Sequence, residues 1–131
     1  MSNNSEHYRK KLINALQNAI VPTDSLHFAS VAVMKDGTEF VGVNIKNSVF
    51  RDTIYAEQNA IGQAITAGYR YGDFMTLYIM VGSERISDLK YINRAVICEF
   101  YEPNAEITCM NLFGEQAVLR VDNLYSSVFN Y

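Results

Sequence analysis

The sequence predicts an α/β domain with helices on both faces of one sheet. Two observations lead to this class. Stretches of strand composition alternate with stretches of helical periodicity, and no internal repeat or linker divides the 131 residues. The length suits a single domain over residues 1–131, because a chain of this size supports one continuous hydrophobic core.

The first predicted elements are a helix and a β-hairpin. The helix spans residues 5–20 and has one apolar stripe at three- and four-residue spacing, made of Tyr8, Leu12, Ile13, Leu16, Ala19 and Ile20. Pro22 is expected to end it. Residues 28–34 form an apolar run suited to a buried strand, and Asp36-Gly37 supplies a turn before a second strand at 39–43.

The next predicted helix lies within residues 55–69. Its inner stripe consists mostly of small side chains, which allow close packing against a sheet: Ala56, Ala60, Ile61, Ala64 and Ile65. Gly68 suits the C-terminal end of this helix. Strands are expected at 75–81, 107–110 and 117–120, with a helix around 93–101 and a short tail.

Composition and charge exclude several classes of partner. The net charge is −3 and the basic residues are scattered, which is unlike the basic surface that binds duplex nucleic acid. No apolar run approaches the roughly 20 residues of a membrane-spanning helix. The first residues show no secretion signal, so we expect a cytoplasmic protein with reduced cysteines.

The most specific pattern is GVNIKNSVFRDTIYAEQNAI, over residues 42–61. It resembles the signature of cytidine deaminases, in which Gly-x-Asn-x-Glu-Asn precedes Cys-Ala-Glu or His-Ala-Glu at the start of a helix. Weaker similarities, such as the turn at 35–37 and Arg94, extend over nearly the whole chain. The resemblance implies a three-layer α/β/α sandwich around a mixed five-stranded sheet. It also implies a homo-oligomer, either a tetramer or a dimer.

The family's zinc site has no match in this sequence. Cytidine deaminases bind zinc through a His or Cys before Ala-Glu and through two cysteines at Cys-x-x-Cys spacing. The corresponding residues here are Tyr55, Lys90 and Asn93. The chain contains only His7, His27, Cys98 and Cys109, and no two of these lie three or four residues apart. The sequence therefore predicts no metal ligands and no cofactor.

The remaining positions of the resemblance form a substrate pocket. Glu57 stands at the position of the family's proton shuttle, although a Glu in the first turn is also favoured by the helix dipole. The pocket residues implied are Leu26, Asn44, Lys46, Phe50, Ala56, Glu57 and Phe129. Lys46 replaces a ribose-binding Glu. If it faces the cavity, we expect anionic ligands to be favoured, and the alternative is that it points to solvent. Ordinary packing explains Leu26, Phe50 and Phe129 equally well.

Three functional hypotheses stay open. The first is a pseudoenzyme whose remodelled pocket binds a nucleoside or nucleotide. The second is an active cytidine or pyrimidine nucleoside deaminase with a non-standard metal site or none. The third is an inactive subunit of an active paralogue, in which Phe129 and Arg94 serve the partner.

We also expect Lys90 to replace the zinc ion electrostatically. An unpaired buried carboxylate raises its pKa or destabilises the fold. Pairing of Lys90 with Glu57 would remove that penalty, with Tyr55 and Asn93 as further hydrogen-bond partners.

Overall fold

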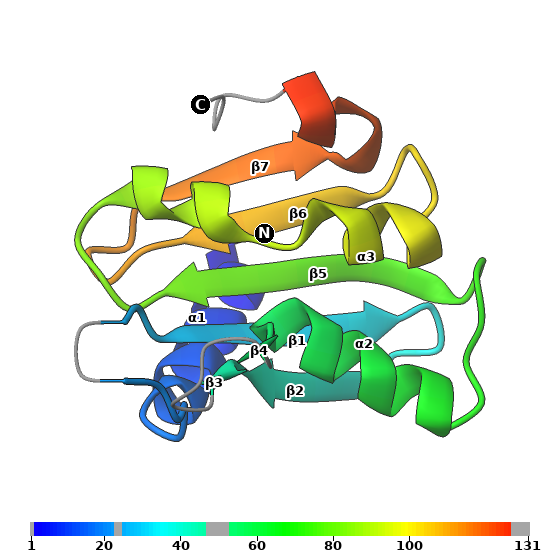
Figure 1. The fold of residues 1–131 in the computed structure, drawn as a ribbon. Coiled ribbons are helices and arrows are strands. Elements are labelled where there is room, and N and C mark those ends of the chain that lie inside the picture. The colour runs from blue at the N-terminus through cyan, green and yellow to red at the C-terminus, as the bar shows by residue number, and fades with distance from the viewer. Residues whose placement is uncertain (1, 23–24, 47–52, 127–131) are drawn as a thin grey trace.

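A mixed five-stranded sheet forms the centre of the computed structural model, which describes residues 2–22, 25–46 and 53–126. Its strands lie in the order β2-β1-β5-β6-β7 (Figure 1). They are β1 (Phe28–Met34), β2 (Glu39–Val43), β5 (Phe74–Val81), β6 (Glu106–Met110) and β7 (Gln116–Arg120). Strands β5 and β6 are parallel and the other neighbouring pairs are antiparallel. The predicted hairpin of β1 and β2 is confirmed.

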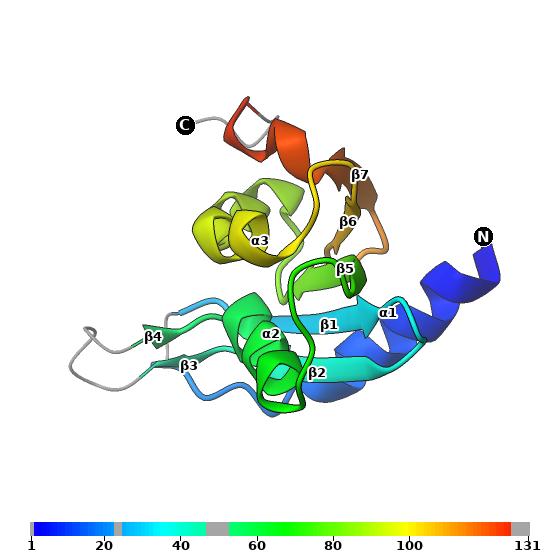
Figure 2. The same cartoon turned by 90° about the vertical axis from the view of Figure 1, so that its right-hand side faces the viewer.

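Helices cover both faces of this sheet. Helix α1 (Ser2–Leu16) packs on one face, and α2 (Ala56–Thr66) and α3 (Arg94–Phe100) pack on the other (Figure 2). The predicted three-layer arrangement is therefore confirmed. None of the described helices combines the length and the apolar character that a bilayer-spanning segment needs.

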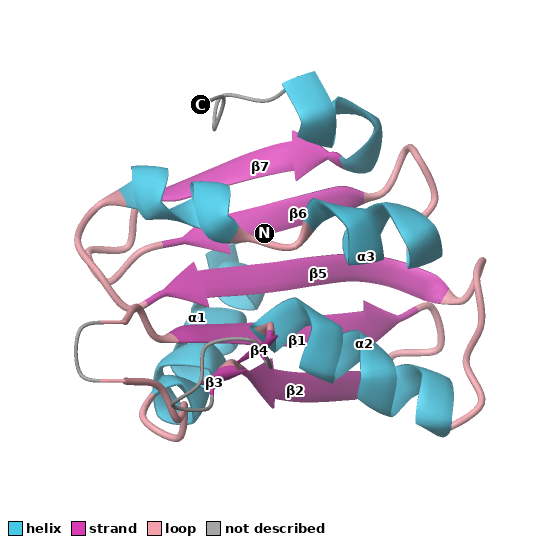
Figure 3. Ribbon diagram, in the orientation of Figure 1, coloured by secondary structure: helices cyan, strands magenta, loops and turns pink. Residues whose placement is uncertain are grey.

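Three short elements were absent from the sequence prediction. They are the two-stranded sheet of β3 (Ile45–Lys46) and β4 (Thr53–Ile54), and the 3₁₀ helices η1 (Ile86–Tyr91) and η2 (Val121–Ser126) (Figure 3). Each is too short to show a sequence period. Two of them matter for the site, because β3 and β4 project beside α2 and η1 leads into α3.

The first helix begins and ends earlier than predicted. It spans Ser2–Leu16 rather than residues 5–20, and Ile13 and Ile20 are exposed instead of lying in the apolar stripe. The reason is tertiary, because Ile20 pairs with the edge of β3. Its N–H donates to the Asn44 carbonyl at 3.2 Å, and its carbonyl accepts from the Lys46 N–H at 2.8 Å. Leu12 and Leu16 remain buried against the sheet, as predicted.

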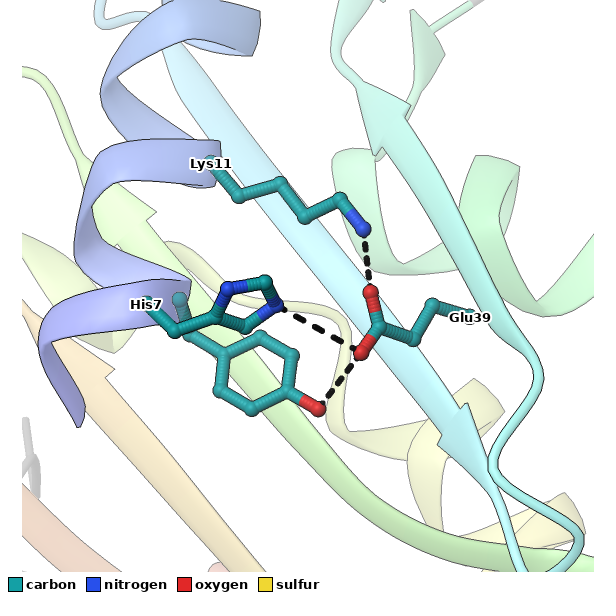
Figure 4. A network of polar contacts seen from close by, with 4 residues as sticks. His7, Lys11 and Glu39 are labelled. Carbon is teal, nitrogen blue, oxygen red and sulfur yellow. Dashed lines mark hydrogen bonds and ion pairs between the residues drawn. The ribbon is translucent and has the colours of Figure 1, made fainter. Parts of the chain in front are cut away.

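A polar network holds α1 on the sheet. Glu39 on β2 accepts hydrogen bonds from the Tyr8 hydroxyl and from Lys11, and His7 lies 3.7 Å from the same carboxylate (Figure 4). The hydrogen bonds lower the pKa of Glu39 against the opposing effect of its burial. This network lies on the face of the sheet opposite to α2, so it stabilises the scaffold and does not contact the site described next.

Candidate functional site

Close packing of α2 on β2 positions the start of that helix. A Cβ atom added to Gly42 would lie 2.5 Å from the Ala60 nitrogen and 2.6 Å from the Ala56 oxygen, so only glycine allows this approach. The small residues of the predicted stripe are buried here, as expected. At the other end, Gly68 adopts a left-handed φ of 106°, which confirms its predicted role.

Glu57 lies in the first turn of α2, and its side chain is 1% exposed. Its carboxylate accepts a short hydrogen bond from the backbone N–H of Asn93, just before α3. Burial raises the pKa of Glu57, and the hydrogen bonds from Asn93 and from its own backbone only partly oppose that effect. The site therefore contains a buried carboxyl group whose pKa is raised above its ordinary value.

Asn44 fixes the segment that enters β1. It is buried, and its side-chain oxygen accepts from the Phe28 N–H at 2.8 Å while its side-chain nitrogen donates to the Leu26 carbonyl at 2.9 Å. One amide hydrogen of Asn44 has no further recorded partner among the described residues. The side chain therefore supports the wall of the site and can offer a single donor to a ligand.

A cavity of about 380 Å³ opens above these residues. Among the described residues, its lining consists of Ser25, Leu26, Phe28, Asn44, Lys46, Thr53, Tyr55, Ala56, Glu57, Tyr91 and Ile92. The cavity thus brings together the implied pocket residues Leu26, Asn44, Lys46, Ala56 and Glu57. Phe50 and Phe129 lie outside the described residues, so their predicted roles stay predictions.

Five lining residues were missed by sequence reasoning: Ser25, Phe28, Thr53, Tyr91 and Ile92. Thr53 could have been found only by pairing β3 with β4, where it lies directly opposite Lys46. Phe28 was considered only as the first residue of a buried strand, and the structure places it both at the start of β1 and in the cavity lining. Tyr91 and Ile92 lie in the segment aligned with the family's Cys-x-x-Cys, where only the ligand positions were considered.

The expected pairing of Lys90 with Glu57 is wrong. Lys90 lies 5.3 Å from the centre of the Tyr91 ring and makes no recorded ion pair among the described residues. It lines a neighbouring cavity of about 480 Å³, together with Tyr55, Tyr91, Ile92 and Arg94. Lys90 lies in η1, and the Glu57 carboxylate accepts the Asn93 N–H instead of a hydrogen bond from Lys90.

Asn93 and Arg94 organise the chain around α3. The Asn93 side chain caps the helix by accepting from the Val96 N–H at 3.2 Å. The buried Arg94 donates to the Leu124 carbonyl at 2.9 Å and to the Lys90 carbonyl at 3.0 Å. These contacts join η1 and η2 to α3, which gives Arg94 a structural role within this chain.

The residues at the family's ligand positions do not fit a zinc ion. Tyr55 is an exposed phenol at the start of α2, Lys90 carries an ammonium group, and Asn93 uses its side-chain oxygen as a helix cap. The described residues contain no group of three His, Cys, Asp or Glu side chains able to hold a metal. Cys109 is buried, and burial together with the nearby Glu57 charge raises its pKa to about 12, which disfavours the thiolate that binds metals.

Known proteins resemble this chain over most of its length. The family model described as "Cytidine and deoxycytidylate deaminase zinc-binding region" matches residues 2–99. A cytidine deaminase of Mycoplasma genitalium is 26% identical over 129 residues, or 98% of each chain. A cytidine deaminase of Halalkalibacterium halodurans is 27% identical over 120 residues, which cover 92% of this chain and 89% of that protein.

Solved structures that resemble this chain are also cytidine deaminases. The cytidine deaminase of Burkholderia pseudomallei superimposes with a TM-score of 0.78 at 25% identity, over 88% of this chain and 91% of that one. The Mycobacterium leprae cytidine deaminase shares the fold, with a TM-score of 0.66 at 20% identity over 90% of this chain and 93% of that one. On the family match over residues 2–99 and the shared mixed sheet, this chain belongs to the cytidine and deoxycytidylate deaminase family.

Proposed function

We propose that this protein binds a pyrimidine nucleoside or nucleotide in the Glu57 cavity and does not catalyse zinc-dependent deamination. The observation that carries the proposal is the contrast between the two halves of the site. The cavity and its buried carboxyl group are present, whereas Tyr55, Lys90 and Asn93 supply no donor set for zinc. A volume of about 380 Å³ lies within the usual range of small-molecule sites, about 300–1,000 Å³.

The lining suits a flat heterocycle with polar edges. Phe28, Leu26 and Ile92 provide apolar surface, and Glu57 provides a buried group able to donate a hydrogen bond when protonated. Asn44 can add one amide donor. Relatives named cytidine deaminase support a pyrimidine as the heterocycle.

The second candidate is an active deaminase. Family membership over residues 2–99 and the burial of Glu57 inside the cavity favour it. The chemistry of this chain counts against it, because a water molecule without a metal has a pKa near 15.7 and is a poor nucleophile, compared with about 7 on catalytic zinc. Glu57 alone offers a base or acid but nothing that lowers the pKa of water.

Three measurements on one purified sample separate these candidates. We expect less than about 0.1 zinc per chain by elemental analysis, no uridine or deoxyuridine product from cytidine or deoxycytidine, and a thermal shift with a pyrimidine ligand. A ligand at about one hundred times its dissociation constant adds about 2.7 kcal/mol of stability. Stoichiometric zinc with product formation would establish the second candidate, and no shift with any pyrimidine ligand would refute the binding proposal.

We further propose a cytoplasmic homo-oligomer, a tetramer or a dimer. An alternative is assembly with an active paralogue, because a chain lacking zinc ligands can still contribute side chains to a neighbour's site. Light scattering on the purified protein gives the mass of the homo-oligomer. Co-expression with an intact deaminase, followed by mass measurement of the purified complex, tests the mixed assembly.

A further inference from the structure

The mouth of the Glu57 cavity carries a cation and a hydroxyl on adjacent strands. Lys46 and Thr53 are direct cross-strand partners in β3 and β4, so their side chains lie on the same face, and both line the cavity. Figure 2 shows the short β3–β4 pair projecting beside the start of α2. A lysine ammonium and a threonine hydroxyl both donate hydrogen bonds, so this pair presents donors to the cavity.

The basic and the acidic residue of the described cavity lining do not form an ion pair with each other. Of the eleven described lining residues, Lys46 is the only basic one and Glu57 the only acidic one. Glu57 is buried and accepts the Asn93 N–H, whereas Lys46 is half-buried and makes no recorded ion pair among the described residues. Among the described residues, Lys46 therefore lines the cavity without an anion to neutralise its charge. An anionic group of a ligand could take that place.

We propose that the cavity selects a nucleoside monophosphate over a neutral nucleoside, with Lys46 and Thr53 binding the phosphate. This inference rests on the proposed function, because it assumes that the ring occupies the part of the cavity between Phe28 and Glu57. Lysine binds phosphate as a point charge, and hydrogen bonds between charged groups are about twice as strong as neutral ones. The partial shielding of Lys46 from water strengthens that attraction relative to an exposed lysine.

The test compares four ligands by calorimetry: cytidine, cytidine 5′-monophosphate, cytidine 3′-monophosphate and inorganic phosphate. In the unmodified protein, we expect at least one monophosphate to bind about tenfold or more tightly than cytidine, the size expected for one charge-assisted hydrogen bond. Lys46→Met should reduce that advantage to about twofold or less. Thr53→Val should reduce it by a smaller factor. The matched control is Lys10→Met, an exposed lysine on α1 whose loss should change nothing.

The outcomes separate the phosphate assignment from the proposed function on which it rests. Equal binding of cytidine and both monophosphates in the unmodified protein overturns the phosphate assignment and leaves the proposed function standing. If the monophosphate still binds more tightly than cytidine in Lys46→Met but not in Lys90→Met, the phosphate lies in the neighbouring cavity. This result also overturns the assignment to Lys46 and Thr53. Tight binding of inorganic phosphate alone overturns the nucleotide assignment. Failure of all four ligands, together with no thermal shift with any pyrimidine ligand, refutes the proposed function itself. The comparison of ligands in the unmodified protein needs no variant, so a Lys46 variant that fails to fold does not prevent the decision.

Discussion

Replacing Glu57 with glutamine should stabilise the protein at neutral and alkaline pH. The Glu57 side chain is buried, its pKa is raised by burial, and no cation pairs with it among the described residues. Glutamine has nearly the same shape, keeps an oxygen for the Asn93 N–H, and cannot ionise. The substitution therefore removes the penalty of burying a charge while retaining the hydrogen bond.

The pH dependence of this effect has a definite sign. A carboxyl group with a raised pKa in the folded state holds its proton more tightly when folded than when unfolded. As the pH rises above the ordinary value of 4.5, the unfolded chain loses this proton first, and the free energy of unfolding falls. The slope is at most about 1.4 kcal/mol per pH unit, and it ends once the pH has passed the folded pKa. Below pH 4.5 the group contributes no such dependence.

Urea unfolding of the unmodified protein and Glu57→Gln, measured from pH 4 to pH 8, tests this reasoning. The two free energies of unfolding should agree within about 1 kcal/mol near pH 4, and the variant should become progressively more stable as the pH rises. Groups with lowered pKa values, such as Asp36 and Asp122, titrate in both proteins, so their contributions cancel in the difference. The exposed Glu99→Gln is the matched control and should stay within about 0.5 kcal/mol at every pH.

The variant Glu57→Ala distinguishes the effect of the Glu57 charge on stability from the effect of its hydrogen bond with Asn93. Alanine also removes ionisation, but it leaves the Asn93 N–H without its acceptor, which costs about 1–3 kcal/mol at all pH values. A Glu57→Gln variant that is less stable than the unmodified protein at pH 8, or a difference that does not change with pH, would refute the view that Glu57 is a buried carboxyl without a counter-ion.

Three further predictions concern the packing of α2, the hydrogen bonds of Asn44 and the charge of Lys90. Gly42→Ala should destabilise the protein by about 1–3 kcal/mol in urea unfolding, because its Cβ would clash with the α2 backbone, whereas the control Gly62→Ala meets nothing within 4 Å and should stabilise α2 by about 0.5–1 kcal/mol. Asn44→Ala should cost about 2–4 kcal/mol and weaken ligand binding, because two backbone groups lose their buried partner. Lys90→Met should cost about 1 kcal/mol or less and be additive with Glu57→Gln; a coupling above about 0.5 kcal/mol in the double-mutant cycle would show that the two groups interact after all.

The sequence by itself determined the three-layer arrangement and the family. It also determined that the residues at the family's zinc-ligand positions are poor metal ligands. Helix and strand periods act between residues a few positions apart, so they predicted the hairpin, the alanine stripe of α2 and the helix end at Gly68. The number and spacing of the His and Cys residues decided that the chain lacks a local pair of such ligands, because that statement needs no coordinates. The position of Glu57 at the start of a helix was also predictable from its neighbours.

Only the tertiary structure decided what surrounds Glu57. Asn93 lies 36 residues away, and its N–H reaches the carboxylate because α3 packs beside α2. Periodicity could not reveal that Ile20 leaves its helix to pair with β3, nor that the 3₁₀ turn places Lys90 in the neighbouring cavity. Such contacts join segments far apart in the chain, and their geometry depends on how whole elements pack, which local spacing does not encode.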